Sequence, residues 1–141
     1  MNGYLVDTNV ISELVKHPPN ENVYQYVSQI PLGKIFISSL TIYEIAYGIS
    51  RMPMSKKRAL LDRQTKRLIQ NMQHLAFAKE DVHETVNIAT KARAEGTPLD
   101  DHIIDTMLAG TAKHHDLTIL TRNEAEFTAA GVPFVNPWRS E

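Results

Sequence analysis

Three acidic residues of this chain are candidate ligands for a hard metal cation. Asp7 directly follows a short apolar run, and Glu44 and Asp105 each lie within a helical pattern further along the chain. Carboxylate oxygens are the ligands that Mg²⁺ and Mn²⁺ prefer in proteins. Such a site suits the attack of water on a phosphodiester, because the cation lowers the pKa of water and neutralises charge on the phosphoryl oxygens. The chain has no cysteine, which excludes a thiolate metal site.

Asp7 is followed by Thr8 and Asn9, so a carboxylate, a hydroxyl and an amide meet at the end of a predicted buried strand. This group is well placed to bind a cation, with Thr8 and Asn9 as supporting residues. The same residue types are also common N-caps of helices, so a purely capping role for Asp7 stays open at this point.

Glu44 follows Thr41 by three residues within the helix expected at residues 40–49. That spacing is typical of a capping box, which would explain Glu44 without a metal. The helix also begins just after a strand, which places Glu44 near the carboxyl edge of the predicted sheet. Glu44 could therefore stabilise the start of the helix and also face a cleft. The apolar face of this helix is expected to comprise Ile42, Ile45, Ala46 and Ile49.

Asp105 is the most informative acid, because helical spacing puts it on one stripe with Leu108 and Ala109. A charge on a core-facing stripe of small residues is costly unless a cation or hydrogen bonds compensate it. The preceding Asp100 and Asp101 are expected to cap this helix rather than to bind a metal.

A second strand tip supplies further polar groups. Thr121 and Asn123 follow the strand expected at residues 117–120, and Glu126 in the next short helix is expected to reach the same edge as a fourth metal ligand. Glu124 and Asn123 compete with Glu126 for that place, and the sequence does not separate them.

The six histidines are not expected to bind a metal. His114 and His115 lie near the end of a predicted helix, where the helix dipole favours a cationic side chain. The other four are expected at the surface or in satisfied hydrogen bonds: His17, His74, His83 and His102. Three aromatic residues are expected to pack in the core or at a dimer contact, with a surface for a binding partner as the alternative: Tyr43, Tyr47 and Trp138.

Short apolar runs alternate with helical patterns along the chain. Strands are expected at residues 4–6, 35–37, 75–78, 117–120 and 134–135, and helices at residues 9–16, 20–30, 40–49, 54–73, 81–95 and 102–115. This order indicates an α/β fold with a central parallel sheet that helices cover on both faces. In such sheets ligands bind at the carboxyl ends of the strands, which is where the acids are expected.

The 141 residues, of which 43% are hydrophobic and 22% charged, are expected to form one globular domain. The start of the chain lacks the basic and long apolar regions of a signal peptide, and no apolar run reaches the length of a membrane span. A cytoplasmic protein without membrane contact is therefore expected.

Charge is unevenly distributed. The chain has a net charge of −1, but the segment at residues 51–67 carries +6 and the remainder −7. A basic segment beside an acidic remainder suggests a phosphate-bearing partner, with Arg51, Lys56, Lys57 and Arg58 as candidate RNA contacts. A solvated helix face is the alternative interpretation.

Taken in order, these motifs resemble those of the PIN-domain family, in particular its VapC-type toxins and their FitB-like branch. The matching stretches are LVDTNVISEL at residues 5–14, SLTIYEI at 39–45, DTMLAGTA at 105–112, TRN at 121–123 and NPW at 136–138. The resemblance covers essentially the whole chain. Some members carry an Asp where this chain has Asn123, and others place their fourth acid where Glu126 lies, so the fourth ligand stays open.

The resemblance implies a three-layer α/β/α PIN fold, a homodimer, and a Mg²⁺-dependent endoribonuclease that cleaves single-stranded RNA, with Mn²⁺ as a substitute. It implies that Asp7, Glu44 and Asp105 are catalytic metal ligands. It also implies a toxin–antitoxin pair, with a VapB-like antitoxin that inhibits the toxin and carries it to operator DNA. Related enteric toxins cut the anticodon loop of initiator tRNA, which makes a tRNA the leading expectation for the substrate.

Other functions share parts of this pattern. An aspartyl-phosphate hydrolase of the haloacid dehalogenase type needs a second Asp two residues after the first, where this chain has Asn9. A response-regulator receiver needs its phosphoacceptor after a central strand, whereas Glu44 and Asp105 lie inside helices. A PIN protein that mainly binds an antitoxin, and DNA through it, without meaningful catalysis also stays open.

Overall fold

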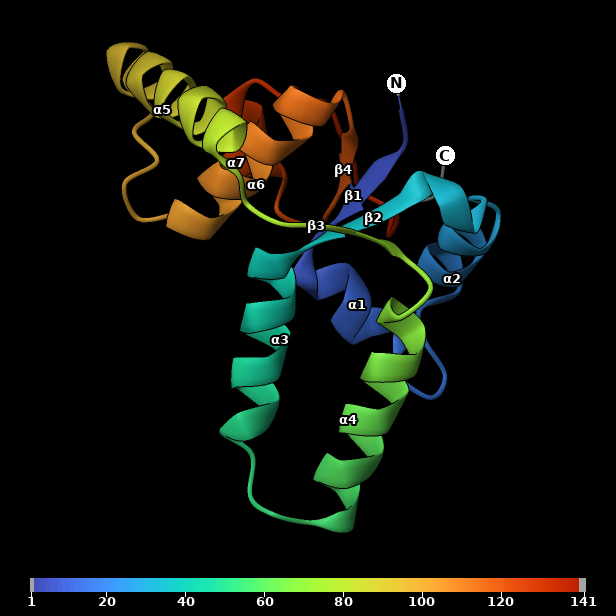
Figure 1. The fold of residues 1–141 in the computed structure, drawn as a ribbon. Helices are drawn as coiled ribbons and strands as arrows, with labels where there is room; N and C mark the ends of the chain where they lie inside the picture. The colour runs from blue at the N-terminus through green and yellow to red at the C-terminus, as the bar shows by residue number, and fades with distance from the viewer. Residues whose placement is uncertain (1, 140–141) are drawn as a thin grey trace.

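A five-stranded, entirely parallel sheet forms the centre of the fold in the computed structural model, which describes residues 2–139 (Figure 1). The strands are β1 (Tyr4–Val6), β2 (Ile35–Ser38), β3 (Gln73–Leu75), β4 (Thr118–Leu120) and β5 (Phe134–Val135). Their order is β3-β2-β1-β4-β5, with β1 paired to both β2 and β4. The expected α/β fold with a central parallel sheet is confirmed.

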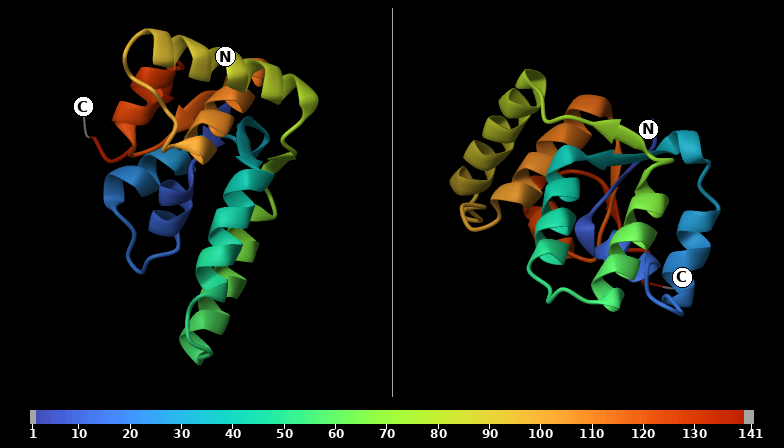
Figure 2. Two further views of the ribbon diagram at one scale, coloured as in Figure 1. Left: turned by 90° about the vertical axis from the view of Figure 1, so that its left-hand side faces the viewer. Right: turned by 60° about the horizontal axis from the view of Figure 1, so that its bottom comes forward.

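Two groups of helices cover the faces of this sheet. The helices are α1 (Thr8–Leu14), α2 (Glu21–Ser28), α3 (Ser39–Ser50), α4 (Lys56–Ile69), α5 (Lys79–Ala94), α6 (Ile103–His115) and α7 (Glu124–Ala130), with a short 3₁₀ turn η1 (Leu32–Lys34). Helices α5, α6 and α7 lie on one face, and α1 to α4 lie on the other (Figures 1 and 2). No helix within residues 2–139 is both long and apolar enough to cross a membrane.

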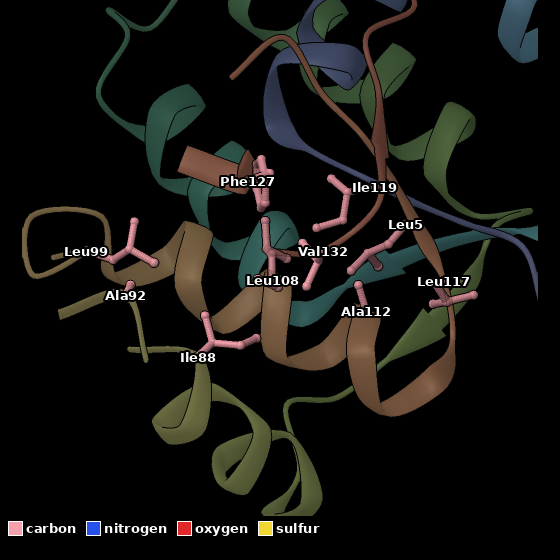
Figure 3. Close-up of a cluster of buried hydrophobic side chains, with 11 residues drawn as sticks. Leu5, Ile88, Ala92, Leu99, Leu108, Ala112, Leu117, Ile119, Phe127 and Val132 are labelled. Atoms are coloured by element: carbon pink, nitrogen blue, oxygen red, sulfur yellow. The ribbon is translucent and has the colours of Figure 1, made fainter. Parts of the chain in front are cut away.

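Leu5 and Val6 show how β1 divides the core between the two faces. Successive side chains of a strand point to opposite sides of the sheet. Leu5 therefore packs with Leu108 and Phe127 of the α5–α7 layer (Figure 3). Val6 packs with Val10 of the other layer. Both strand residues are fully buried, and burial of such a side chain contributes about 1.5–3 kcal/mol to stability. The central strand is thereby fixed, and Asp7 directly follows it.

Helices α3 and α4 form an antiparallel hairpin that extends away from the sheet (Figures 1 and 2). The basic segment at residues 51–67 occupies the end of this hairpin and most of α4. Ser55 caps the start of α4 by accepting a hydrogen bond from the Arg58 amide.

Several element boundaries differ from the sequence-based expectation. The third strand is Gln73–Leu75 rather than residues 75–78, because it is an edge strand that pairs through its backbone and keeps Gln73 and His74 exposed. The N-cap of α3 is Ser38, so Thr41 lies inside the helix, fully buried, and no capping box joins it to Glu44. Ala46, expected on the apolar face of α3, is exposed.

Helix α6 also begins differently. Its N-cap is His102 rather than Asp100 or Asp101, and the Asp100 carboxylate pairs with Arg93 instead. His102 thereby lies one turn from Asp105, at the edge of the sheet where the acids lie.

Candidate active site

Asp7 lies at the carboxyl end of β1 and is also the N-cap of α1. Its Oδ1 accepts the Thr8 amide at 2.7 Å, and its Oδ2 accepts the Thr121 hydroxyl at 2.7 Å and the Asn9 amide group at 3.3 Å. The residue is only 3% exposed. Burial raises the pKa of the Asp7 carboxyl, and the hydrogen bonds from Thr121 and Thr8 oppose that rise. Asp7 therefore caps α1 and also lies in the candidate site.

Glu44 lies in the second turn of α3, beside the start of α1. The Thr8 hydroxyl donates a hydrogen bond of 2.7 Å to its Oε1. Thr8 thus contacts two of the three predicted acids, Asp7 through its backbone and Glu44 through its side chain. Ser38 caps α3, and Glu44 lines the cleft.

Asp105 lies in the first turn of α6, with a side chain that is 19% exposed. It belongs to the same stripe as the buried Leu108 and Ala109, at the point where that stripe leaves the core. Burial raises the pKa of its carboxyl to about 6, with repulsion from Asp7, Glu126 and Glu44 adding to the effect and His102 opposing it. The charges of four carboxylates therefore interact at this edge of the sheet.

Of the two competing glutamates, the structure brings Glu126 to this cluster. Its Oε1 lies 3.7 Å from Nδ1 of His102, which is itself 4.0 Å from Oδ2 of Asp105. His102, Asp105 and Glu126 each offer a ligand atom, and these atoms lie within 4.8 Å of one another. Glu124 instead accepts hydrogen bonds from Asn136 at 2.6 Å and from Arg139.

His102 is exposed at the surface, as expected, but it is not isolated from the acids, because it lies beside Asp105 and Glu126. Its place in the cluster depends on Glu126, which is distant in sequence. The sequence did offer one sign that His102 lies near the site, because His102 precedes Asp105 by three residues, which is one helical turn.

Asp7, Glu44 and Asp105 face an open cleft of about 550 Å³. It is lined by Asp7, Thr8, Asn9, Ser12, Glu13, Lys16, Glu44, Asp105, Arg122, Asn123 and Trp138. Of the predicted supporting residues, Thr8, Asn9 and Asn123 line the cleft, while Thr121 is fully buried behind Asp7. Sequence reasoning missed the cleft-facing side of α1, which contributes Ser12 and Glu13, and the bend after it, which contributes Lys16. It also gave Arg122 no role.

The predicted RNA contacts lie outside the acid cleft. Arg51 packs over the Tyr47 ring at 5.6 Å, and Arg58 donates a hydrogen bond of 3.1 Å to the Met52 carbonyl. Lys57 lines a second groove of about 490 Å³ between α1, α3 and α4, which shares Glu44 and three other lining residues with the acid cleft.

Two of the three aromatic residues, Tyr43 and Tyr47, are not where core packing would put them. Tyr43 and Tyr47 are 62% and 53% exposed, and their rings stack with centroids 5.9 Å apart. The expectation that Tyr43 and Tyr47 pack in the core of this chain is therefore wrong. Trp138 is partly buried against the α1–α4 layer and lies beneath Arg122 at the cleft.

A second group of polar residues ties α5 to α6. Asp81 is fully buried, and its carboxylate accepts the Ala78 amide at 2.8 Å and lies 2.7 Å from Nδ1 of His114. His114 is therefore explained by an interhelical contact and not by the helix dipole alone. A Cβ at Gly110 would lie 2.0 Å from the Thr85 hydroxyl, so this glycine lets the two helices approach closely. Both oxygens of Asp81 are satisfied, which assigns this group a structural role.

A parallel sheet that gathers carboxylates at its carboxyl edge, in an open cleft, is typical of metal-dependent nucleases. The model of the PIN domain matches residues 4–132. The chain belongs to the PIN-domain family and, within it, to the VapC- and FitB-like toxins, a class of nucleases.

Individual relatives cover nearly the whole chain. Toxin FitB of Neisseria gonorrhoeae is 31% identical over 95% of this chain and 97% of its own. The VapC ribonuclease Y4jK of Sinorhizobium fredii is 27% identical over 95% and 96%. The tRNA(fMet)-specific endonuclease VapC of Shigella flexneri is 24% identical over 96% and 97%. Among solved structures, FitAB bound to a DNA fragment superposes with a TM-score of 0.90 at 30% identity, covering 98% of this chain and 97% of that one.

Proposed function

We propose that this chain is the toxin of a type II toxin–antitoxin pair and acts as a Mg²⁺-dependent endoribonuclease on single-stranded RNA. The observation that carries the proposal is the crowding of Asp7, Glu126 and Glu44 around Asp105. Burial, and then repulsion from these three carboxylates, raises the pKa of the Asp105 carboxyl to about 6. Carboxylates held close together in an open cleft are stabilised by a divalent cation, and an open cleft admits a single strand.

Asp7, Glu44, Asp105 and Glu126 would hold the cation. The donor set fits Mg²⁺, with Mn²⁺ as a substitute, because its members are carboxylate oxygens. When bound, the cation lowers the pKa of a water molecule and neutralises charge on the phosphoryl oxygens.

The surrounding side chains orient these ligands. Thr121 and Asn9 hold Oδ2 of Asp7, and Thr8 holds Oε1 of Glu44. Hydrogen bonds of this kind fix the orientation of metal ligands before the metal binds.

The proposed substrate is a tRNA, cut in its anticodon loop, with initiator tRNA as the first candidate. The support is the similarity to the VapC of Shigella flexneri, which is named for that specificity. A loop also presents unpaired nucleotides, which can enter the cleft without melting of a duplex.

The proposed partner is a VapB-like antitoxin that inhibits the toxin and links a toxin homodimer to operator DNA. The similarity to FitAB, a complex bound to DNA, supports this assignment. The apolar groove between α1, α3 and α4 adjoins the acid cleft and offers a surface for an antitoxin segment, lined by Ile11, Val15, Ile45, Ile49, Met52 and Leu61. A segment bound there would lie beside Glu44.

Purified toxin, freed of antitoxin, should cut a total tRNA pool in the presence of Mg²⁺, and sequencing of the new 5′ ends should locate the cut. The Asp7→Asn variant should leave the pool intact while it still dimerises and binds antitoxin, since the substitution keeps the shape of the side chain and removes its charge. If wild type bound antitoxin but cut no RNA with Mg²⁺ or Mn²⁺, the ribonuclease proposal would fail in favour of a non-catalytic binding protein.

A further inference from the structure

Arg122 is the cation of the acid cleft that lacks a carboxylate partner within residues 2–139. The other cation that lines this cleft, Lys16, pairs with Glu13 at 3.1 Å. Once this pair is set aside, the described residues that line the cleft include three carboxylates, those of Asp7, Glu44 and Asp105. Arg122 is the one unpaired cation among these described lining residues. An unpaired guanidinium beside an acidic cluster is available to an anion that the cluster by itself would repel.

The backbone of Arg122 is fixed relative to the acids. Its amide donates a hydrogen bond of 3.2 Å to Oδ1 of Asn9, and the side-chain amide group of Asn9 in turn donates to Asp7. One side chain therefore links the backbone of Arg122 to the first acid. The cation is part of the same framework as the carboxylates.

The side chain of Arg122 is held on an aromatic face. Its guanidinium carbon lies 4.9 Å from the ring centroid of Trp138. Trp138 is anchored by its own amide, which donates to Asn136 at 3.0 Å, and by its carbonyl, which accepts from Asn22 at 3.1 Å. A guanidinium over a ring keeps the N–H groups of its edge free, and these groups match two oxygens of a phosphate.

We propose that Arg122, presented by Trp138, binds a backbone phosphate of the RNA strand, next to the phosphodiester that the carboxylates act on. This inference rests on the proposed ribonuclease function and adds a binding residue that lies outside the basic segment at residues 51–67. The bound phosphate is not the one that reacts, so Arg122 contributes to binding of the substrate more than to the chemical step.

Arg122→Gln tests this assignment in steady-state cleavage of a single-stranded RNA that contains the mapped cut site. KM should rise about tenfold, as expected when one charge-assisted hydrogen-bonded pair is removed, and kcat should change by less than about twofold. The salt dependence of kcat/KM should become shallower by about 0.7 in the log–log slope. Arg122→Lys keeps the positive charge but lacks the paired N–H groups of the guanidinium. Its KM should therefore lie between those of wild type and Arg122→Gln, while its salt slope stays at the wild-type value.

Arg93→Gln is the matched control, because Arg93 is an exposed arginine that pairs with Asp100 and does not line the cleft. Its KM and slope should equal those of wild type. A thermal melt of each variant establishes that it is folded. If Arg122→Gln does not fold, Arg122→Lys decides, because a raised KM with an unchanged slope supports the phosphate contact and a wild-type KM overturns it.

Trp138 supplies a readout that does not depend on cleavage, because it is the only tryptophan of the chain. A phosphate that binds Arg122 alters the contact between the cation and the ring. Rapid mixing of wild type with RNA should therefore change the tryptophan fluorescence before any product forms, and Arg122→Gln should lose that change.

Three results would overturn the inference while the ribonuclease proposal stands. One is a KM and slope of Arg122→Gln equal to wild type. Another is a fall in kcat at unchanged KM, which would place Arg122 in the chemical step. The third is weaker antitoxin binding with unchanged RNA kinetics, which would assign Arg122 to the protein interface. A wild-type protein that cuts no RNA at all would instead refute the ribonuclease function itself.

Discussion

The hydroxyl of Thr8 donates a hydrogen bond of 2.7 Å to the carboxylate of Glu44, across the boundary between α1 and α3. The amide of the same residue donates to Asp7 at 2.7 Å. A single residue thus couples the acid at the end of the central strand to the acid on the helical hairpin. The geometry of the two acids depends on a side chain that holds no charge.

Thr8→Val should reduce kcat/KM by about 10- to 100-fold, the usual effect of removing a hydrogen bond that orients a metal ligand. The backbone bond to Asp7 survives this change, so the loss is confined to Glu44. Thr8→Ser restores a hydroxyl and should recover most of the activity in the same cleavage assay. Wild-type activity of Thr8→Val would show that Glu44 needs no partner to orient it.

Removal of divalent cations should abolish cleavage, because the proposed ligands supply charge and orientation but no nucleophile. Excess chelator should stop the reaction, and Mg²⁺ or Mn²⁺ in excess over the chelator should restore it. Asp7→Asn, prepared in parallel, controls for contaminating nuclease. Undiminished cleavage in chelator by wild type, absent from Asp7→Asn, would exclude a metal mechanism.

The contribution of Asp105 to the stability of the metal-free protein should fall as pH rises from about 4 to about 6. The pKa of Asp105 is about 6 in the folded chain against 3.8 for the unperturbed group, so the folded state binds its proton more tightly. This contribution is present below pH 4 and is lost as pH rises through 6. Its upper limit is about 3 kcal/mol, reduced by the solvent in the open cleft.

Asp105→Asn should remove that part of the pH dependence and melt at or above metal-free wild type near pH 7. Added Mg²⁺ should raise the melting temperature of wild type by mass action, more at pH 7.5 than at pH 5, and that of the variant less. Melts across pH and metal concentration measure both effects. A destabilised Asp105→Asn with an unchanged response to metal would assign Asp105 a structural hydrogen bond instead.

The basic end of the helical hairpin should bind phosphates of the RNA without reading its bases. Replacing Lys56 and Lys57 by Gln should reduce the salt slope of RNA binding by up to about 0.7 for each phosphate that is no longer neutralised. Arg58 stays in place because it hydrogen-bonds the Met52 carbonyl. The same change at Lys79 and Lys91 of α5 is the control, and an equal effect there would point to net charge alone.

Asp81→Ala should destabilise the fold by about 2–4 kcal/mol, because it leaves the Ala78 amide and His114 without their buried partner. Chemical denaturation measures the change, and the exposed Asp101→Ala should have little effect. Cleavage by the folded fraction should stay at the wild-type rate. A specific loss of activity at full stability would instead implicate Asp81 in function.

Local pattern alone was enough to predict the order of strands and helices and the position of Asp7. The alternation of apolar runs with helical spacing is a property of neighbouring residues, and an acid after a buried strand must lie at the sheet edge. The position of Asp105 follows from helical spacing, which puts it on one stripe with Leu108 and Ala109. The bounds of the third strand, Gln73–Leu75, gave no such signal, because an edge strand with exposed side chains needs only backbone pairing.

The tertiary structure decided what depends on residues distant in sequence. Glu124 and Glu126 begin the same helix and have the same chemistry, yet Asn136 and Arg139 hold the first of them away from the acids. The location of Arg122 over Trp138 likewise depends on the last turn of the chain, which returns to the cleft. Side-chain direction at such positions is set by long-range contacts, and composition and periodicity carry no information about them.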